Sequence, residues 1–220
     1  APASFEASLM ASYAALPEGA RAAAAVLAAW AHPVETARVV ALDARATPEA
    51  VESLLAAGLA RRDDDGRVAL SPPALGERVL ESLDEASRRS LHAAAAAWPG
   101  LPAAERFRHL SGAGDARGAL AAAGAALDEG HDDRLAAAAA ALADAEAPEQ
   151  AGEWHERAGR ELAARGRYAR AIPHLERALA LAEQGPVRFE RWHRLSTCYL
   201  RVGRLADLER VVREALDASP

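Results

Sequence analysis

Residues 154–181 read WHERAGRELAARGRYARAIPHLERALAL, and residues 192–216 read WHRLSTCYLRVGRLADLERVVREAL. The two stretches align with an offset of 37 residues, so that Gly166 and Gly203 stand at the same place between two helical patterns. A sequence that repeats every ~20–50 residues is typical of stacked units, each of which buries its apolar face against its neighbour. The C-terminal third therefore predicts two consecutive helical hairpins.

The spacing of these hairpins resembles the tetratricopeptide repeat, whose period is about 34 residues, with three extra residues at Gln184-Gly185-Pro186. Small residues at its signature positions let two helices approach closely, and large ones fill the space against the next hairpin. The first unit matches at Gly159, Gly166, Tyr168, Ala171 and Ala178, and the second at Trp192, Leu195, Tyr199, Gly203, Ala215 and Pro220.

The resemblance implies a protein-binding surface, because such arrays bind ligands on the concave side lined by the first helix of each hairpin. We expect the large Trp154 and Trp192 to lie in the core instead. The alternative is that the charged side chains of these first helices are only exposed to solvent and bind no partner. The candidate binding residues are Glu153, Glu156, Arg160, Glu190, His193, Thr197 and Arg201.

The N-terminal region has a different pattern. Apolar spacing predicts helices over residues 5–16, 17–30 and 34–42. Thr47-Pro48-Glu49 is typical of a helix start, and that helix is expected to end at Gly58. Residues 59–62 and 67–70 then predict a β-hairpin around the Asp-Gly of residues 65–66, followed by a helix through Leu83. Helices followed by a two-stranded wing are typical of a winged helix.

The middle of the chain reads as helical throughout, over residues 85–97, 102–111, 115–128 and 131–146. We therefore expect a winged-helix-like domain at 1–83, a helical bridge of degenerate repeats at 84–147, and two tetratricopeptide-like repeats at 148–220. The predicted fold class is mainly all-α, with a small β-hairpin wing followed by an α-α superhelix.

Composition narrows the possible functions. All 26 basic residues are Arg and the net charge is −6, which argues against a nucleic-acid partner because such proteins usually carry a basic field. The single Cys198 excludes an internal disulfide framework and favours a reducing, cytoplasmic location. The sequence contains no long apolar run without charges, so no membrane span is predicted. A start at Ala-Pro-Ala suggests a fragment of a longer protein.

No motif for catalysis, cofactor binding or metal binding is found. A phosphate-binding loop needs a Lys that the chain lacks, and the seven His show no metal-ligand spacing. Cys198 is expected to be a packed thiol. We therefore predict no enzyme activity, no cofactor and no metal.

Three stretches resemble the arm that follows the ATPase core in STAND signalling ATPases, which include large bacterial transcription regulators of the LuxR type and kinase–ATPase fusions. They are AALPEGARAAAAVLAAWAHPVE (14–35), VESLLAAGLARRDDDGRVALSPPALGERVLESLDEASRRSLHAAAA (51–96) and ERFRHLSGAGDARGALAAAGAAL (105–127). The resemblance implies a non-catalytic regulatory arm that binds proteins: the upstream ATPase core of the same chain, a signalling partner, or both. Many members have a His after the second wing strand, where this chain has Ser71-Pro72, so nucleotide sensing there is not implied.

Two other functions remain open. The first is a DNA-binding winged-helix transcription regulator, although the candidate recognition helix at 47–57 carries Glu49 and Glu52 and no Arg. The second is a stand-alone tetratricopeptide scaffold or adaptor.

Overall fold

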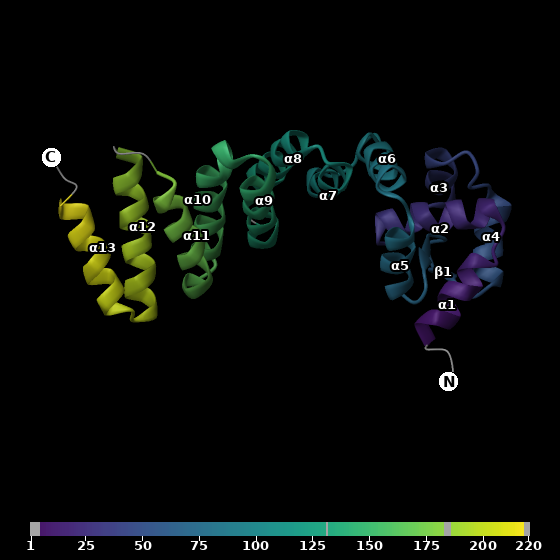
Figure 1. Cartoon of the computed structure of the whole chain (residues 1–220), viewed down its shortest axis with the longest axis horizontal. Helices are drawn as coiled ribbons and strands as arrows, with labels where there is room; N and C mark the ends of the chain where they lie inside the picture. The colour runs from purple at the N-terminus through teal and green to yellow at the C-terminus, as the bar shows by residue number, and fades with distance from the viewer. Residues whose placement is uncertain (1–4, 131, 183–185, 218–220) are drawn as a thin grey trace. The chain divides into compact units, whose positions relative to one another are not determined.

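The computed structural model describes residues 5–130, 132–182 and 186–217, and the chain divides into two compact units (Figure 1). Unit 1 contains the residues up to Leu101 together with 112–114, and unit 2 contains 102–111 and the residues from Asp115 onward. Helices dominate the described residues, which contain one small antiparallel sheet. The predicted mainly all-α fold class with a small β-hairpin is confirmed.

Unit 1 is organised around one helix, α2, whose sequence is rich in Ala. This helix packs against α3, α4, α5, α6 and β2, and it is buried from Ala22 to Trp30. Ala side chains allow this because they let neighbouring backbones approach α2 from several directions. The elements are α1 (Phe5–Ala14), α2 (Glu18–Trp30), α3 (Thr36–Leu42), α4 (Pro48–Ala56), β1 (Ala60–Arg62), β2 (Val68–Leu70), α5 (Ala74–Ser82) and α6 (Glu85–Ala96).

The local signals in this unit have the expected effects. The Thr47 hydroxyl accepts a hydrogen bond from the Ala50 N–H at 3.2 Å, which caps α4. In the hairpin, Asp63 Oδ1 accepts the backbone N–H of Arg67 at 2.8 Å, and Gly66 has the positive φ of 79° that favours glycine. Ala60 pairs with Leu70 and Arg62 with Val68. The predicted helix start and hairpin are confirmed.

The predicted start of the third helix at Val34 is wrong. The helix begins at Thr36, and Val34 forms an antiparallel bridge with Val68, with N···O distances of 3.0 and 2.7 Å. Both side chains are buried. The backbone of Val34 is therefore hydrogen-bonded to the hairpin, and these bonds attach the wing to the segment between α2 and α3.

The remaining helices follow one another with short connections, and from α8 onward each packs on the next. They are α7 (Ala103–Ala113), α8 (Ala116–Glu129), α9 (Asp133–Glu146), α10 (Pro148–Ala164), α11 (Tyr168–Ala180), α12 (Pro186–Val202) and α13 (Leu205–Asp217). The repeats predicted from the sequence correspond to the pairs α10–α11 and α12–α13.

The two repeat turns have the same hydrogen bonds. Gly166 N–H donates to Ala163 O, and the next N–H donates to Leu162 O; in the second repeat Gly203 N–H and its successor donate to Leu200 O and Tyr199 O. Both glycines have positive φ, of 70° and 76°, as expected for a glycine that ends a helix. The alignment of these glycines thus reflects the same turn used twice.

The cores of the repeats contain the predicted large residues. Trp154 and Trp192 are 8% and 3% exposed, which confirms that they are core residues. Pro173 lies inside α11 on its exposed side. The expected domain boundaries after residues 83 and 147, and the continuity of the bridge between them, stay predictions.

Candidate protein-binding surface

The seven candidate residues lie on the first helices of the two hairpins, α10 and α12, and the structure connects several of them. Glu156 accepts hydrogen bonds from two guanidinium groups of α12, from Arg191 Nε at 2.8 Å and from Arg194. Arg194 also donates to Glu190 at 3.2 Å. The acidic candidates Glu156 and Glu190 are thus joined through Arg194, while Glu153 lies exposed on α10.

A pocket of about 270 Å³ opens between α10, α11 and α12. Three of the candidates line it, namely Arg160, His193 and Thr197. A fourth, Arg201, stacks its guanidinium 5.9 Å from the ring centroid of Tyr168, which also lines the pocket. We call this the α10–α12 pocket; its lining is Gly159, Arg160, Ala163, Tyr168, Leu175, His193, Arg194, Thr197 and Cys198.

The structure therefore divides the candidate residues by charge. The basic and hydroxyl-bearing residues gather at the α10–α12 pocket, and none of Glu153, Glu156 and Glu190 lines it. An apolar floor next to guanidinium groups can bind a group that is part apolar and part anionic.

Cys198 forms part of the floor of this pocket and is not an activated nucleophile. Its side chain is buried, and burial raises the pKa of the thiol. A nucleophilic cysteine needs the opposite shift, toward the thiolate. The neighbouring Tyr199 is also buried; burial and the carboxylate of Glu176, to which its hydroxyl donates, raise its pKa to about 12.

Two histidines next to the candidate surface form a pair that the sequence patterns did not predict. His155 of α10 and His174 of α11 bring their Nδ1 atoms to 3.0 Å, and His155 Nε2 lies 2.8 Å from Asp144 Oδ2 of α9. Arg177 donates to the other oxygen of Asp144 at 3.0 Å. Three successive helices are joined by this network, which we call the histidine node.

Protonation in the histidine node follows from these contacts. The hydrogen bond from His155, followed by that from Arg177, lowers the pKa of Asp144, so this carboxylate is ionised and acts only as an acceptor. His155 then donates through Nε2, and in its neutral form it accepts through Nδ1 from His174. Burial, followed by the charges of His155 and Arg170, lowers the pKa of His174.

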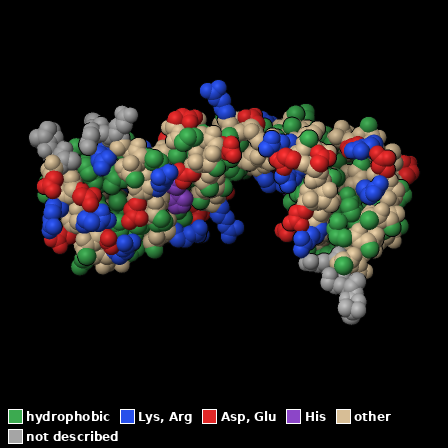
Figure 2. Space-filling view, viewed as in Figure 1, with side chains coloured by type: hydrophobic (Ala, Val, Ile, Leu, Met, Phe, Trp, Pro, Cys, Tyr) green, Lys and Arg blue, Asp and Glu red, His purple; other side chains and the backbone are tan. Residues whose placement is uncertain are grey.

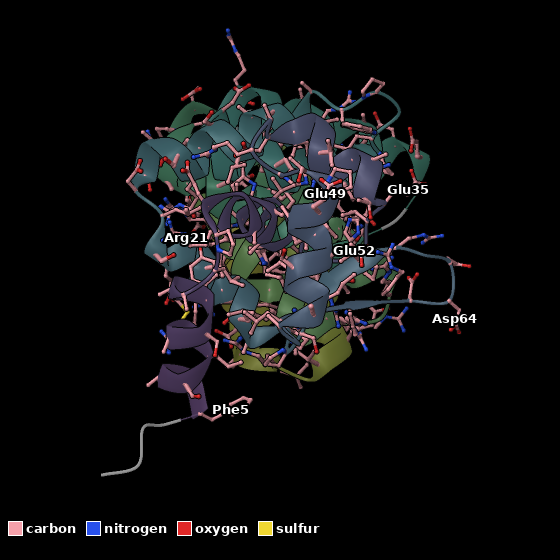
Figure 3. The ribbon with its side chains drawn as sticks, turned by 90° about the vertical axis from the view of Figure 1, so that its right-hand side faces the viewer. Phe5, Arg21, Glu35, Glu49, Glu52 and Asp64 are labelled. Carbon is pink, nitrogen blue, oxygen red and sulfur yellow. The ribbon has the colours of Figure 1, made fainter. Side chains whose placement is uncertain are left out.

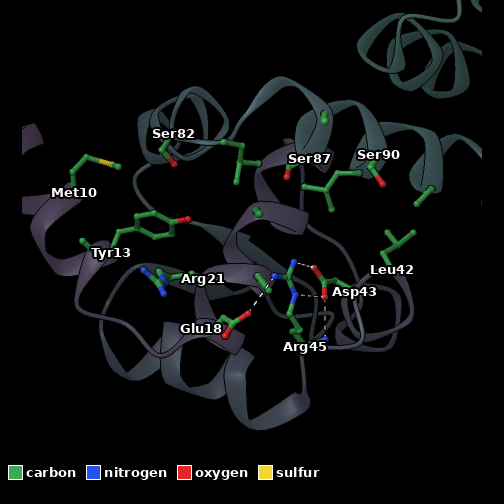
Figure 4. A pocket seen from close by; sticks show the side chains of 17 residues that line it. Met10, Tyr13, Glu18, Arg21, Leu42, Asp43, Arg45, Ser82, Ser87 and Ser90 are labelled. Carbon is green, nitrogen blue, oxygen red and sulfur yellow. Dashed lines mark hydrogen bonds and ion pairs between the residues drawn. The ribbon is translucent and has the colours of Figure 1, made fainter.

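Unit 1 contains a larger hollow of about 860 Å³ between α1, α2, the α3–α4 loop and the α5–α6 region (Figure 4). Arg45 spans its polar side, with contacts of 2.7 Å to Asp43 and 3.3 Å to Glu18. The hydrogen bonds from Arg45 hold the pKa of Asp43 below its usual range. Arg45 is thus paired with two carboxylates at the hollow, and a second guanidinium, that of Arg21, also lines it.

The helix that a DNA-binding winged helix would use is acidic, and the wing carries equal numbers of Arg and Asp. Figure 3 shows Glu49 and Glu52 along α4 and Asp64 at the tip of the wing. Arg62 of the wing is held by an ion pair with Glu52. Acidic and basic side chains are mixed over the face seen in Figure 2.

Within the residues that the structure describes, no group of three or more His, Cys, Asp or Glu side chains is arranged to hold a metal ion. None of the described helices combines the length and the apolar character needed to cross a bilayer.

Comparison with known proteins identifies one informative likeness. The chain is similar to the crystal structure of a Signal Transduction ATPase with Numerous Domains (STAND) protein with a tetratricopeptide repeat sensor from Pyrococcus horikoshii, with a TM-score of 0.56 and 14% sequence identity. The match covers 99% of this chain and 34% of that protein, so the chain spans about a third of its length. At this identity the likeness shows the fold alone. No protein-family model and no curated protein matches the sequence.

Proposed function

We propose that this chain is a non-catalytic regulatory and protein-binding arm of a STAND-type signalling ATPase. In this proposal unit 1 is a winged-helix-like domain, and the hairpins α10–α11 and α12–α13 bind a protein through the face formed by α10 and α12. The arm would hold or release the ATPase core of the same cytoplasmic protein in response to that partner.

The observation that carries the proposal is the extent of the likeness. Almost the whole chain, rather than the repeats alone, superposes on part of a single STAND protein whose sensor is a tetratricopeptide repeat. Independent support comes from the bridge between Val34 and Val68, because a wing attached to the segment before the next helix is expected of a winged helix. The candidate residues at the α10–α12 pocket supply a partly charged surface of the kind that protein partners use.

The proposal is tested on the full-length product of the gene. We expect it to contain an ATPase core, and deletion of this segment should change the rate of ATP hydrolysis, because a regulatory arm biases the equilibrium between inactive and active states. An unchanged rate, or a full-length product without an ATPase core, would contradict the proposal.

A DNA-binding regulator is the weaker alternative, because Glu49 and Glu52 lie where phosphates would have to approach and Glu52 neutralises Arg62. A stand-alone scaffold would use the same α10–α12 face, and it differs from the regulatory arm only in lacking a linked ATPase core. The full-length experiment therefore separates these two functions as well.

A further inference from the structure

We infer that the α10–α12 pocket binds an acidic segment of a protein partner, with one apolar side chain on the pocket floor and a neighbouring carboxylate held by Arg160 and Arg201. This inference rests on the proposed function, since it assigns a ligand chemistry to the same face. It goes further in stating the charge of the partner and the residues that recognise it.

The size and floor of the pocket select a single apolar side chain. Its volume of about 270 Å³ lies below the ~300–1,000 Å³ of pockets that enclose a whole small molecule. Tyr168, Leu175 and Cys198 contribute apolar surface to the lining. Gly159 brings this floor close to α10, because a Cβ there would stand 2.6 Å from Leu175 Cγ.

The rim of the pocket has a positive character. Its nine lining residues include Arg160, Arg194 and His193, and no Asp or Glu. The charge of Arg194 is compensated by Glu156 and Glu190. Arg160 has no ion pair among the described residues and is exposed, so its charge is available to a ligand.

Arg201 supplies a second guanidinium from α12. It is exposed, it forms no ion pair within the described part of the chain, and its contact is with the ring of Tyr168. Arg160 and Arg201, which form no ion pair among the described residues, come from different helices. Arg160 lines the pocket, and Arg201 contacts the lining residue Tyr168. Guanidinium groups bind carboxylates through directed, charge-assisted hydrogen bonds, so an acidic partner satisfies this arrangement and a basic one is repelled.

The test uses the 220-residue chain and a fluorescently labelled peptide, capped at both ends, in which one Leu is flanked by Glu on each side. Two matched probes replace either all the Glu by Lys or the Leu by Ser. We expect the Glu–Leu peptide to bind with an affinity that falls as salt rises, the Ser peptide to bind at least about fivefold more weakly, and the Lys peptide not to bind.

Variants of the two cations locate the site. Arg160→Glu and Arg201→Glu should each weaken binding of the Glu–Leu peptide about tenfold or more, because each converts an attraction into a repulsion. Arg134→Glu, which makes the same charge change at an exposed position of α9, is the matched control and should leave affinity unchanged. Circular dichroism and thermal unfolding verify that each variant is folded.

Three outcomes would overturn the inference: no binding of the Glu–Leu peptide, equal or tighter binding of the Lys peptide, or equal effects of Arg134→Glu and Arg160→Glu. Its failure is distinguishable from failure of the proposed function. If deletion of the arm changes ATP hydrolysis but the acidic peptide does not bind, only the ligand assignment is wrong. If the peptide binds and the deletion has no effect, the pocket is correctly assigned and the regulatory role is wrong.

Discussion

The histidine node joins two imidazole side chains, those of His155 and His174. Their Nδ1 atoms lie 3.0 Å apart, a distance at which only one of them can carry a proton. If both Nδ1 atoms carry a proton, the hydrogen bond between α10 and α11 is replaced by a repulsion. The node therefore makes the packing of α9, α10 and α11 sensitive to pH.

The pH dependence has a definite sign. The pKa of His174 is lowered in the folded protein, mainly by burial, so the unfolded chain takes up a proton first as pH falls below about 6.5. The free energy of unfolding should therefore fall as the pH drops from about 7.5 to about 5.5, which is roughly the range over which histidine titrates. Asp144 acts in a different window: its lowered pKa gives stability that is present above about 3.9 and lost only below it.

His174→Gln should flatten this decrease in urea unfolding measured across the histidine range, since Gln cannot gain the charge. His193→Gln, at an exposed position of α12, is the control and should retain the slope of the wild type. A wild-type slope in His174→Gln would show that other histidines cause the pH dependence.

Gly159 is required by close packing between α10 and α11. An added Cβ would lie 2.6 Å from both Cγ and Cδ2 of Leu175, which is itself buried. Gly159→Ala should therefore destabilise the protein by about 1–3 kcal/mol through overpacking, even though Ala is the better helix former. Gly124→Ala on α8 is the control, because its nearest neighbour is the end of Arg157 at 3.9 Å, and it should be neutral or slightly stabilising in the same denaturant titration.

At the scale of elements, an ion pair links α4 to the wing. Arg62 of β1 pairs with Glu52 of α4, and Glu49 stands in the first turn of the same helix. The ion pair neutralises Arg62, one of the few cations of this surface that could contact a phosphate. The acidic character of this surface comes from the helix, because the three Arg of the wing balance its three Asp.

This pairing predicts no specific binding of duplex DNA. A titration with mixed-sequence duplex at low salt should show weak association at most, because phosphate contacts require uncompensated positive charge. Glu52→Gln, which frees Arg62, should strengthen that weak association slightly. A submicromolar, salt-sensitive complex of the wild type that is lost in Arg61→Ala and Arg62→Ala would contradict the prediction.

At the scale of the whole molecule, the large apolar residues of the middle region are shared between two cores. Trp98 and Leu101 pack in the core of unit 1, and Phe107 and Leu110 pack in a core of unit 2. Each unit thus has an apolar interior of its own. The sequence predicts that the helices of residues 84–147 nevertheless form a continuous bridge, because no long flexible run separates them.

Limited digestion with an Arg-specific protease tests this bridge. Arg106 and Arg108 are half-buried in α7, so they should be cleaved later than the exposed Arg67 of the wing, because proteolysis requires local unfolding. Early, dominant cleavage at Arg106, Arg108 or Arg117 that releases two stable fragments would show a hinge between independent domains.

Local features of the fold were accessible from the sequence because they depend on neighbouring residues. The cap at Thr47, the Asp-Gly hairpin and the turn glycines Gly166 and Gly203 each act within a few positions of the chain. The resemblance to the tetratricopeptide repeat also predicted Trp154 and Trp192 as core residues, because large residues fill the space between its helices. Val34 was misassigned because its partner, Val68, is 34 positions away and the bridge between them leaves no local pattern.

The sequence by itself determined the succession of helices, the single hairpin and the repeated pair at the C-terminus, since periodicity, caps and turn residues specify these through short-range interactions. Only the tertiary structure decided which side chains meet. It joined His155 to His174 and Asp144 across three helices, paired Glu156 with Arg191 and Arg194, and gathered Arg160 and His193 around one pocket. The reason is physical: hydrogen bonds and ion pairs depend on distances between atoms of different helices, and those distances are set only when the helices pack.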